Sequence, residues 1–254
     1  MKCPDLLSRQ VDFLGVGVND VNTSQLLECV LSFASGNQQR KIMYVNADCM
    51  VIAQRNEAYR EVLNSADLVY PDGAGVVIGA KILGLKIAGR STAADFMPEF
   101  CSHFASRGLR VFFLGAREGV ASRAATKLMA KYPDLKIVGT QHGYFPRHDT
   151  WDIISKVNES QADILLVGFG APYQELWIDR YCNHLGPKVI WGVGGLFDFL
   201  SGRTPRGPRL LLDHGLEWLC RLVAEPRRLW RRYLVGNVIF MAMVIRQRIR
   251  QSGW

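Results

Sequence analysis

The chain has 254 residues, and 48% of them are hydrophobic, which is enough for a large core in one domain or in a domain with an extension. Its formal net charge is +8. All of this charge lies in residues 203–254, which hold eleven Arg, no Lys and three acidic residues. The six Cys residues form no C-x-x-C pair, which argues against a disulfide framework or a zinc site. With no signal-like N-terminus, this pattern predicts a cytoplasmic protein.

Short apolar stretches with strand character alternate with stretches of helical spacing. The expected strands are residues 11–18, 41–45, 66–70, 109–115, 136–140, 164–168 and 189–192. The expected helices are residues 24–35, 47–64, 75–83, 93–107, 119–132, 151–160 and 174–184. Strands without polar alternation, each followed by a helix, predict an α/β fold with a mostly parallel, Rossmann-like sheet and helices on both faces.

The composition changes at residues 202–208, where two Pro and two Gly interrupt the chain. This predicts an α/β domain over residues 1–202 and a helical, Arg-rich appendage over residues 203–254. The apolar run 233–245 is thirteen residues long, short of the roughly 20 needed to cross a bilayer, and Arg residues flank it on both sides. The appendage is therefore expected to bind a membrane surface or a diphosphate. No nucleic-acid-binding signature is present, so a nucleic acid is not an expected partner.

Several nucleotide and hydrolase motifs are absent from the sequence. There is no P-loop, no G-x-S-x-G, no H-E-x-x-H and no D-x-D pair. After Gly73 and Gly75, the dinucleotide fingerprint needs its third glycine where Ile78 stands, so that match fails. A diphosphate substrate would therefore be neutralised by backbone amides and Arg, and we expect no metal and no cofactor.

Two polar residues follow expected strands at the edge where a parallel sheet binds its ligands. Asp72 ends an apolar strand and precedes two glycines, which suits a general base for an acceptor hydroxyl. The alternative is a turn residue or a helix N-cap. Asn46 stands at an equivalent strand end, where it could orient Asp72, hold a sugar hydroxyl or cap the next helix.

Two more strand-end loops are rich in glycine. In GFGAPYQE (168–175), Gly170 and the start of the next helix could hold a phosphate, and Gln174 could reach a ligand. In GVGG (192–195), Gly194 has the same kind of position. The alternative for both is a simple turn. None of the five His residues has metal-ligand spacing.

The appendage has Arg residues at seven- and three-residue spacings. Arg221, Arg228 and Arg231 would share a face if one helix continued through them, and that face could clamp a diphosphate without a metal. The alternative is a solvated basic face.

Five segments, in this order, carry a family resemblance: YVNAD (44–48), NSADLVYPDGAGVV (64–77), GFGAPYQE (168–175), GVGGLFDFLSG (192–202) and GLEWLCRLVAEPRRLWRRY (215–233). Together they resemble the WecG/TagA/CpsF glycosyltransferases, glycosyltransferase family 26, over roughly residues 10–235.

The resemblance implies an inverting, metal-independent transferase that moves a sugar from a UDP-sugar to a polyprenyl-diphosphate-linked sugar in cell-surface polysaccharide synthesis. It implies that the protein works on the inner face of the cell membrane and self-associates. The resemblance assigns Asp72 as catalytic base and Asn46 as its neighbour. It assigns substrate contacts to Arg90, Gln174, Arg221, Arg228 and Arg231.

One position departs from the family pattern. Many members have Thr two residues before the Asn, and this chain has Tyr44. A phenol there would reshape the sugar pocket, so N-acetylmannosamine, N-acetylmannosaminuronic acid and glucose all stay open as the donated sugar. The alternative to an enzyme is a non-catalytic, membrane-surface protein that binds a UDP-sugar.

Overall fold

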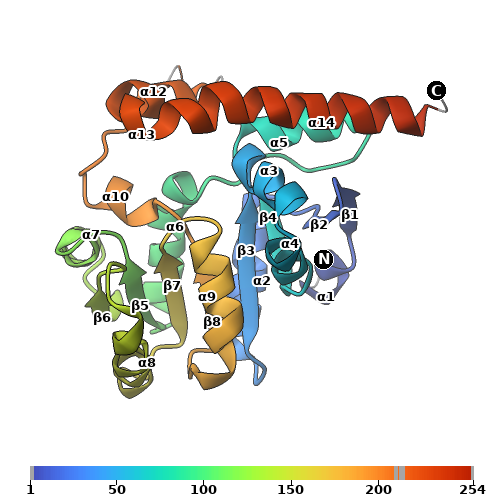
Figure 1. Cartoon of the computed structure of the whole chain (residues 1–254). Helices are drawn as coiled ribbons and strands as arrows, with labels where there is room; N and C mark the ends of the chain where they lie inside the picture. Colours follow the sequence, from blue (N-terminus) through green and yellow to red (C-terminus); the bar gives the residue numbers. More distant parts are fainter. Residues whose placement is uncertain (1–2, 209–210, 212–214, 253–254) are drawn as a thin grey trace. The chain divides into compact units, whose positions relative to one another are not determined.

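The computed structural model describes residues 3–208, 211 and 215–252 (Figure 1). Its main sheet has the strand order β4-β3-β8-β7-β5-β6. The pairs from β3 to β6 along this order are parallel. The strands are β3 (Arg40–Val45), β4 (Leu68–Pro71), β5 (Arg110–Gly115), β6 (Lys136–Gln141), β7 (Ile164–Gly168) and β8 (Val189–Gly192). The mostly parallel α/β fold is confirmed.

Helices connect the strands and form the end of the chain. They are α1 (Cys3–Leu7), α2 (Thr23–Ser35), α3 (Ala47–Arg55), α4 (Glu57–Asn64), α5 (Ala74–Leu83), α6 (Ala93–Ser106), α7 (Val120–Lys131), α8 (Thr150–Glu159), α9 (Tyr173–Tyr181), α10 (Leu196–Leu200), α12 (Glu217–Ala224), α13 (Pro226–Trp230) and α14 (Gly236–Gln251). Three shorter turns are η1 (Arg147–Asp149), η2 (Cys182–His184) and η3 (Arg231–Val235), the last of π type.

Two expected elements are wrong in the same way, because each is split by a local turn. The expected strand 11–18 is an antiparallel hairpin of β1 (Gln10–Phe13) and β2 (Val16–Asn19). Leu14 and Gly15, both with positive φ, form its two-residue turn. The expected helix 47–64 ends at Arg55, and Asn56 starts α4 by accepting a hydrogen bond from the Tyr59 N–H at 3.0 Å.

The described chain forms two compact units. Unit 1 is Met1–Thr23, Tyr44–Thr92 and Thr204–Trp254, and unit 2 is Ser24–Met43 and Ala93–Arg203. In unit 1, α14 packs on α3 and α5 (Figure 1). The contact with α5 needs Gly79, because a Cβ there would lie 2.9 Å from the Phe240 ring and 3.2 Å from a Val244 methyl group. Gly79 stands one residue too late for the dinucleotide fingerprint, and in the structure it lets two helices approach closely.

Phe240 anchors α14 in unit 1, and its removal is expected to destabilise the protein. Its side chain is buried and meets Phe13 edge-on, with ring centroids 6.0 Å apart. Phe240→Ala should lower the free energy of unfolding by about 3–5 kcal/mol, because the cavity it leaves adds to the lost burial. Urea unfolding checks this, with the exposed Val238→Ala as matched control. An equal effect of both substitutions would contradict the packing of α14.

The face of α14 away from this contact is apolar and open to solvent. Val238, Ile245 and Ile249 are at least half exposed and recur at seven and four residues, so they lie on one side of the helix. Three exposed Arg residues (Arg246, Arg248 and Arg250) follow in its last turns. Within residues 3–208, 211 and 215–252, no helix combines the length and the apolar content that a membrane span requires.

Candidate active site

Asp72 lies in unit 1 where β3 and β4 end. Its backbone N–H donates to the carbonyl oxygen of Val45, the last residue of β3, at 2.8 Å. Gly73, with a φ of +85°, is the N-cap of α5. The capping role considered for Asp72 is therefore not the one observed, and its carboxyl group hydrogen bonds with Thr92 instead.

The surroundings of Asp72 make its carboxyl group a weaker acid than usual. Burial and, to a smaller extent, the nearby Glu217 carboxylate raise the pKa of Asp72 to about 6. The Thr92 hydrogen bond and the guanidinium groups of Arg221 and Arg232 oppose this rise in pKa. A carboxyl group with a pKa near 6 is mostly ionised at neutral pH and can then accept a proton, as a general base must.

Asn46 is positioned by the same strand end. It is the N-cap of α3, and its Oδ1 accepts a hydrogen bond from the Cys49 N–H at 3.1 Å. The capping alternative is thus observed. This bond fixes the side chain immediately after Val45, whose carbonyl oxygen holds Asp72.

Tyr44 and Arg90 come from neighbouring segments of unit 1. Tyr44 is the next-to-last residue of β3 and is buried, with its ring centroid 6.3 Å from that of Tyr70 in β4. Arg90 is partly exposed and precedes Ser91, whose N–H donates to the Pro71 carbonyl oxygen at 2.9 Å. This bond brings the segment that carries Arg90 and Thr92 to the end of β4.

Helix α12 of the appendage brings two charges near Asp72. Glu217 and Arg221 are four residues apart, so they lie on one face of the helix, and both act electrostatically on Asp72. Glu217 is also 4.0 Å from Arg206. The preceding loop packs closely on α5, because a Cβ on Gly215 would lie 2.7 Å from the Ala74 Cβ.

Arg228 and Arg231, the other two arginines of the predicted face, have partners close to them in the chain. One continuous helix through residues 221–231 is not observed, because Glu225 has a non-helical backbone with φ −136° and ψ 60°. Arg228 forms an ion pair with Glu225 at 2.8 Å, and the Arg231 guanidinium lies 5.2 Å from the Trp230 ring centroid. Both are exposed. Of the three residues, the structure brings Arg221 to Asp72.

In unit 2, Gln174 links two strand-end loops. Its side chain is fully buried, and its Oε1 accepts hydrogen bonds from Gly194 N–H at 2.9 Å and Gly170 N–H at 3.2 Å. Its Nε2 donates to Glu175 Oε1 at 2.7 Å. Gln174 therefore holds the glycine loops after β7 and β8 together, and Gly170 has open space where a Cβ would stand.

The Glu175 carboxyl group predicts a pH-dependent stability. Burial raises its pKa to about 7, although the Gln174 hydrogen bond opposes the rise. Because the pKa of Glu175 in the folded state is above its unfolded value, the contribution of this group to stability is fully present below about pH 4.5 and is lost as the pH rises through 7. Between pH 5 and pH 8, the free energy of unfolding of Glu175→Gln should therefore rise by about 3 kcal/mol relative to that of the wild type.

The measurement for Glu175→Gln is urea unfolding of both proteins across this pH range. Glu159→Gln, at the exposed end of α8, is the matched control and should show no pH-dependent difference. A Glu175→Gln protein that is less stable by a constant amount at every pH would contradict the titration of this buried group.

The glycines of unit 2 also allow strand ends to approach one another. A Cβ on Gly115 would lie 2.5 Å from the Gly168 carbonyl oxygen, and one on Gly168 would lie 2.7 Å from that of Gly194. Only residues without a side chain fit this packing of the ends of β5, β7 and β8. Gly168 and Gly115 therefore serve the backbone, whereas Gly170 faces open space.

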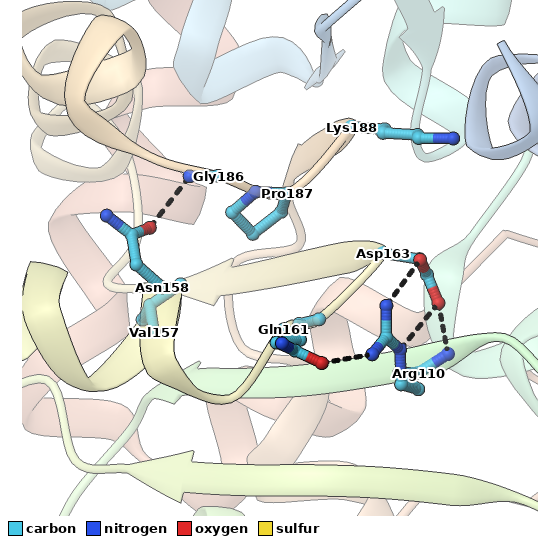
Figure 2. A pocket seen from close by; sticks show the side chains of 9 residues that line it. Arg110, Val157, Asn158, Gln161, Asp163, Gly186, Pro187 and Lys188 are labelled. Atoms are coloured by element: carbon cyan, nitrogen blue, oxygen red, sulfur yellow. Dashed lines mark hydrogen bonds and ion pairs between the residues drawn. The ribbon is translucent and has the colours of Figure 1, made fainter. Parts of the chain in front are cut away.

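A pocket of about 210 Å³ lies at the other edge of the sheet, where β5, β7 and β8 begin (Figure 2). In it the guanidinium group and the backbone N–H of Arg110 bind the Asp163 carboxylate. Burial alone would raise the pKa of Asp163, but these hydrogen bonds hold it below its usual value. This ion pair joins β5 to the start of β7, away from the strand ends that carry the candidate site residues.

Three residues that act on Asp72, and the ion-pair partner of one of them, were not found from the sequence. They are Asp48, Thr92, Glu217 and Arg232. Thr92 and Glu217 act on Asp72 from segments 20 and 145 residues away in the chain, and no spacing rule links such positions. Among the described residues, no three His, Cys, Asp or Glu side chains come together as a metal site would require.

The fold places the chain among α/β proteins whose ligand sites lie at the carboxyl ends of parallel strands. A model of the Glycosyl transferase WecG/TagA/CpsF family matches residues 11–253, and the chain belongs to this family and is a glycosyltransferase. The chain is similar to the N-acetylglucosaminyldiphosphoundecaprenol N-acetyl-beta-D-mannosaminyltransferase of Bacillus spizizenii, at 32% identity over 89% of this chain and 85% of the relative. The protein of the same name from Bacillus subtilis is 32% identical over 76% of this chain and 74% of its own length.

Proposed function

We propose that this glycosyltransferase moves a hexose-type sugar from a UDP-sugar to a polyprenyl-diphosphate-linked sugar, in the synthesis of a cell-surface polysaccharide. The names of its relatives describe transfer of an N-acetylmannosaminyl group to an undecaprenyl-diphosphate-linked sugar. The observation that carries the proposal is the Asp72 carboxyl group, with a pKa raised to about 6 and with Arg221 close by. The family is one of enzymes, which favours catalysis over mere binding of the nucleotide sugar.

In the proposed reaction, Asp72 removes the proton of the acceptor sugar hydroxyl as its oxygen attacks the anomeric carbon of the donor. The bond from that carbon to the UDP oxygen breaks, and its electron pair leaves with the diphosphate. One displacement from the opposite face inverts the anomeric configuration. Asn46 and Arg90 orient the acceptor near Asp72 in this scheme.

The departing UDP gains negative charge, which guanidinium groups and backbone amides can stabilise without a metal. Arg221 is the best placed in unit 1, and Arg228 and Arg231 are exposed for the acceptor diphosphate or for lipid phosphates. In unit 2, the loops at Gly170 and Gly194, which Gln174 holds, are the proposed contacts of the nucleotide. We propose that the reaction needs neither a metal nor another cofactor.

The appendage, residues 203–254 in this proposal, attaches the enzyme to the inner face of the cell membrane. Its support is the exposed apolar face of α14 beside a cluster of Arg, which matches the acyl region and the anionic headgroups of a lipid surface. Self-association of the chain through the same apolar face is part of the proposal.

Replacement of this apolar face by Ser is expected to abolish membrane binding. Val238→Ser, Ile245→Ser and Ile249→Ser together remove three large exposed side chains, so co-sedimentation with vesicles of phosphatidylglycerol should fall at least tenfold. Transfer to a short-chain, water-soluble acceptor should stay at the wild-type rate. Met129→Ser, 37% exposed on α7, is the control. Undiminished vesicle binding by the triple variant would contradict this role of α14.

The test of the function is a panel of UDP-sugars with a short-chain polyprenyl-diphosphate sugar, with EDTA present throughout. We expect one donor to give a disaccharide product of inverted anomeric configuration, read by NMR. The panel contains UDP-N-acetylmannosamine, UDP-N-acetylmannosaminuronic acid and UDP-glucose, because the buried Tyr44 replaces the Thr common in the family. Absence of product with every donor, or activity restored only by divalent cations, would overturn the proposal or its metal-independent form.

A further inference from the structure

Arg232 makes a second contact between the appendage and the catalytic strand end, distinct from that of Arg221. Its Nε lies 3.1 Å from Oδ2 of Asp48. About a third of the Arg232 side chain and a quarter of the Asp48 side chain are exposed, yet the Nε atom is shielded from solvent. Burial lowers the pKa of Arg232, but Asp48 and three weaker partners hold it above its usual value. The charge pair is therefore a partly buried contact within unit 1.

The backbone of the appendage explains why Arg232 points inward. Arg231 and Arg232 open the π-helical turn η3 between α13 and α14. A π turn adds a residue to the helical repeat and so changes which side chains face the protein, and such turns are frequent at functional sites. Arg231 is exposed beside Trp230, whereas Arg232 reaches Asp48 and lies near Tyr44.

Asp48 stands at a sensitive place in the body of unit 1. It is the second residue of α3, the helix that Asn46 caps, and it comes four residues after Tyr44. The same guanidinium group of Arg232 also acts on Asp72. One ion pair thus joins the start of α3, which carries Asn46, to the segment that connects α12 and α13 with α14.

We propose that the Arg232–Asp48 pair is a positioning contact that holds the appendage in the register at which Arg221 and Glu217 of α12 face Asp72. This inference rests on the proposed function. Two simpler explanations fall short. A surface ion pair would not shield Nε, and a carboxylate that serves only the N-terminus of α3 would need no cation.

The pair makes a sharp prediction for transfer to a short-chain, water-soluble acceptor. Asp48→Asn and Arg232→Gln should each lower kcat at least tenfold while KM for the UDP-sugar changes less than threefold, because the pair touches neither substrate. The double variant should be no slower than the slower single variant, since the two residues act as one unit. Arg232→Lys should recover part of the rate, and Arg227→Gln, an exposed neighbour in α13, is the matched control at the wild-type rate.

A pH profile separates positioning from general loss of structure. Four groups face Asp72: Thr92, Glu217, Arg221 and Arg232. Removal of the Arg232 cation should move the acidic limb of kcat/KM to higher pH, whereas partial unfolding would lower the rate without moving it. A profile that keeps its position in Arg232→Gln, or effects of the two single variants that multiply in the double, would overturn the proposal.

Hydrogen exchange gives a readout that does not need activity. The amides of α12 should exchange at least fivefold faster in Asp48→Asn and Arg232→Gln than in the wild type or Arg227→Gln. If the wild-type protein transfers no sugar but the two variants still exchange faster than it does, the proposed function is wrong and the positioning contact stands. Active wild type with unchanged exchange and kcat in both variants would defeat the positioning contact alone.

Discussion

Asp72→Asn is expected to lower kcat by at least 10³-fold while the protein still binds UDP. The amide has nearly the size of the carboxyl group but cannot accept the proton of the acceptor hydroxyl, so only the residual rate from binding and charge stabilisation should survive. A radiolabelled-sugar transfer assay measures the rate, and calorimetry measures UDP binding. Turnover at the wild-type rate would remove Asp72 from the mechanism.

The pH dependence of the wild-type enzyme tests the same group. The base must be ionised, so kcat/KM should rise with pH through about 6, the pKa to which burial and Glu217 bring Asp72. Glu217→Gln should move this limb to lower pH, because it removes a negative charge that opposes the ionisation of Asp72. An acidic limb near pH 4 in the wild type would mean that the carboxyl group is solvated during catalysis.

Asp72→Asn should also stabilise the fold. A carboxyl group whose pKa is raised on folding favours the native state fully below its unfolded pKa of 3.8, and this contribution is lost as the pH rises through about 6. At pH 7.5 the free energy of unfolding of Asp72→Asn should therefore exceed that of the wild type by roughly 1–2 kcal/mol, after allowance for the partial exposure of the residue. Urea unfolding measures this difference. A protein made more stable by the loss of its base would show that the site is strained for function.

The sequence was sufficient for the parallel sheet because its strands are continuous apolar runs. The expected bounds of β7 and β8 equal those observed, since each run is fully buried and followed by glycines. It was insufficient where a polar or small residue makes a local turn, as at Leu14 and Gly15, whose turn lacks the usual Asn-Gly signal, and at Asn56.

In the candidate site, the sequence likewise predicts the residues that follow strands but not those that helix packing brings in. Asp72 and Asn46 follow strands, and parallel strands bring their carboxyl ends together, so the sequence could bring these two residues to one edge. Glu217 and Arg232 come from the appendage, whose α14 packs on α5 at Gly79 and Phe240 and whose Gly215 packs on Ala74. No periodicity in the appendage reveals which of its eleven Arg residues faces inward.

Arg221→Gln is the variant that should separate the appendage arginines by their function. Arg221 acts on Asp72, whereas Arg228 and Arg231 are exposed and have partners close to them in the chain. Loss of a guanidinium group that stabilises the departing diphosphate should lower kcat about 10²–10³-fold. Arg228→Gln and Arg231→Gln should affect mainly the KM of the lipid-linked acceptor, and Arg227→Gln is the control.

Arg221→Gln should lower the rate in two ways that differ in their pH dependence, which makes the test specific. Without this cation the pKa of Asp72 rises further, so the loss of rate should be larger at pH 6 than at pH 8. Above the raised pKa the base is fully ionised again, and the remaining deficit then measures the stabilisation of the leaving UDP alone. A deficit that vanishes at pH 8 would assign Arg221 to the base, and a deficit independent of pH would assign it to the diphosphate.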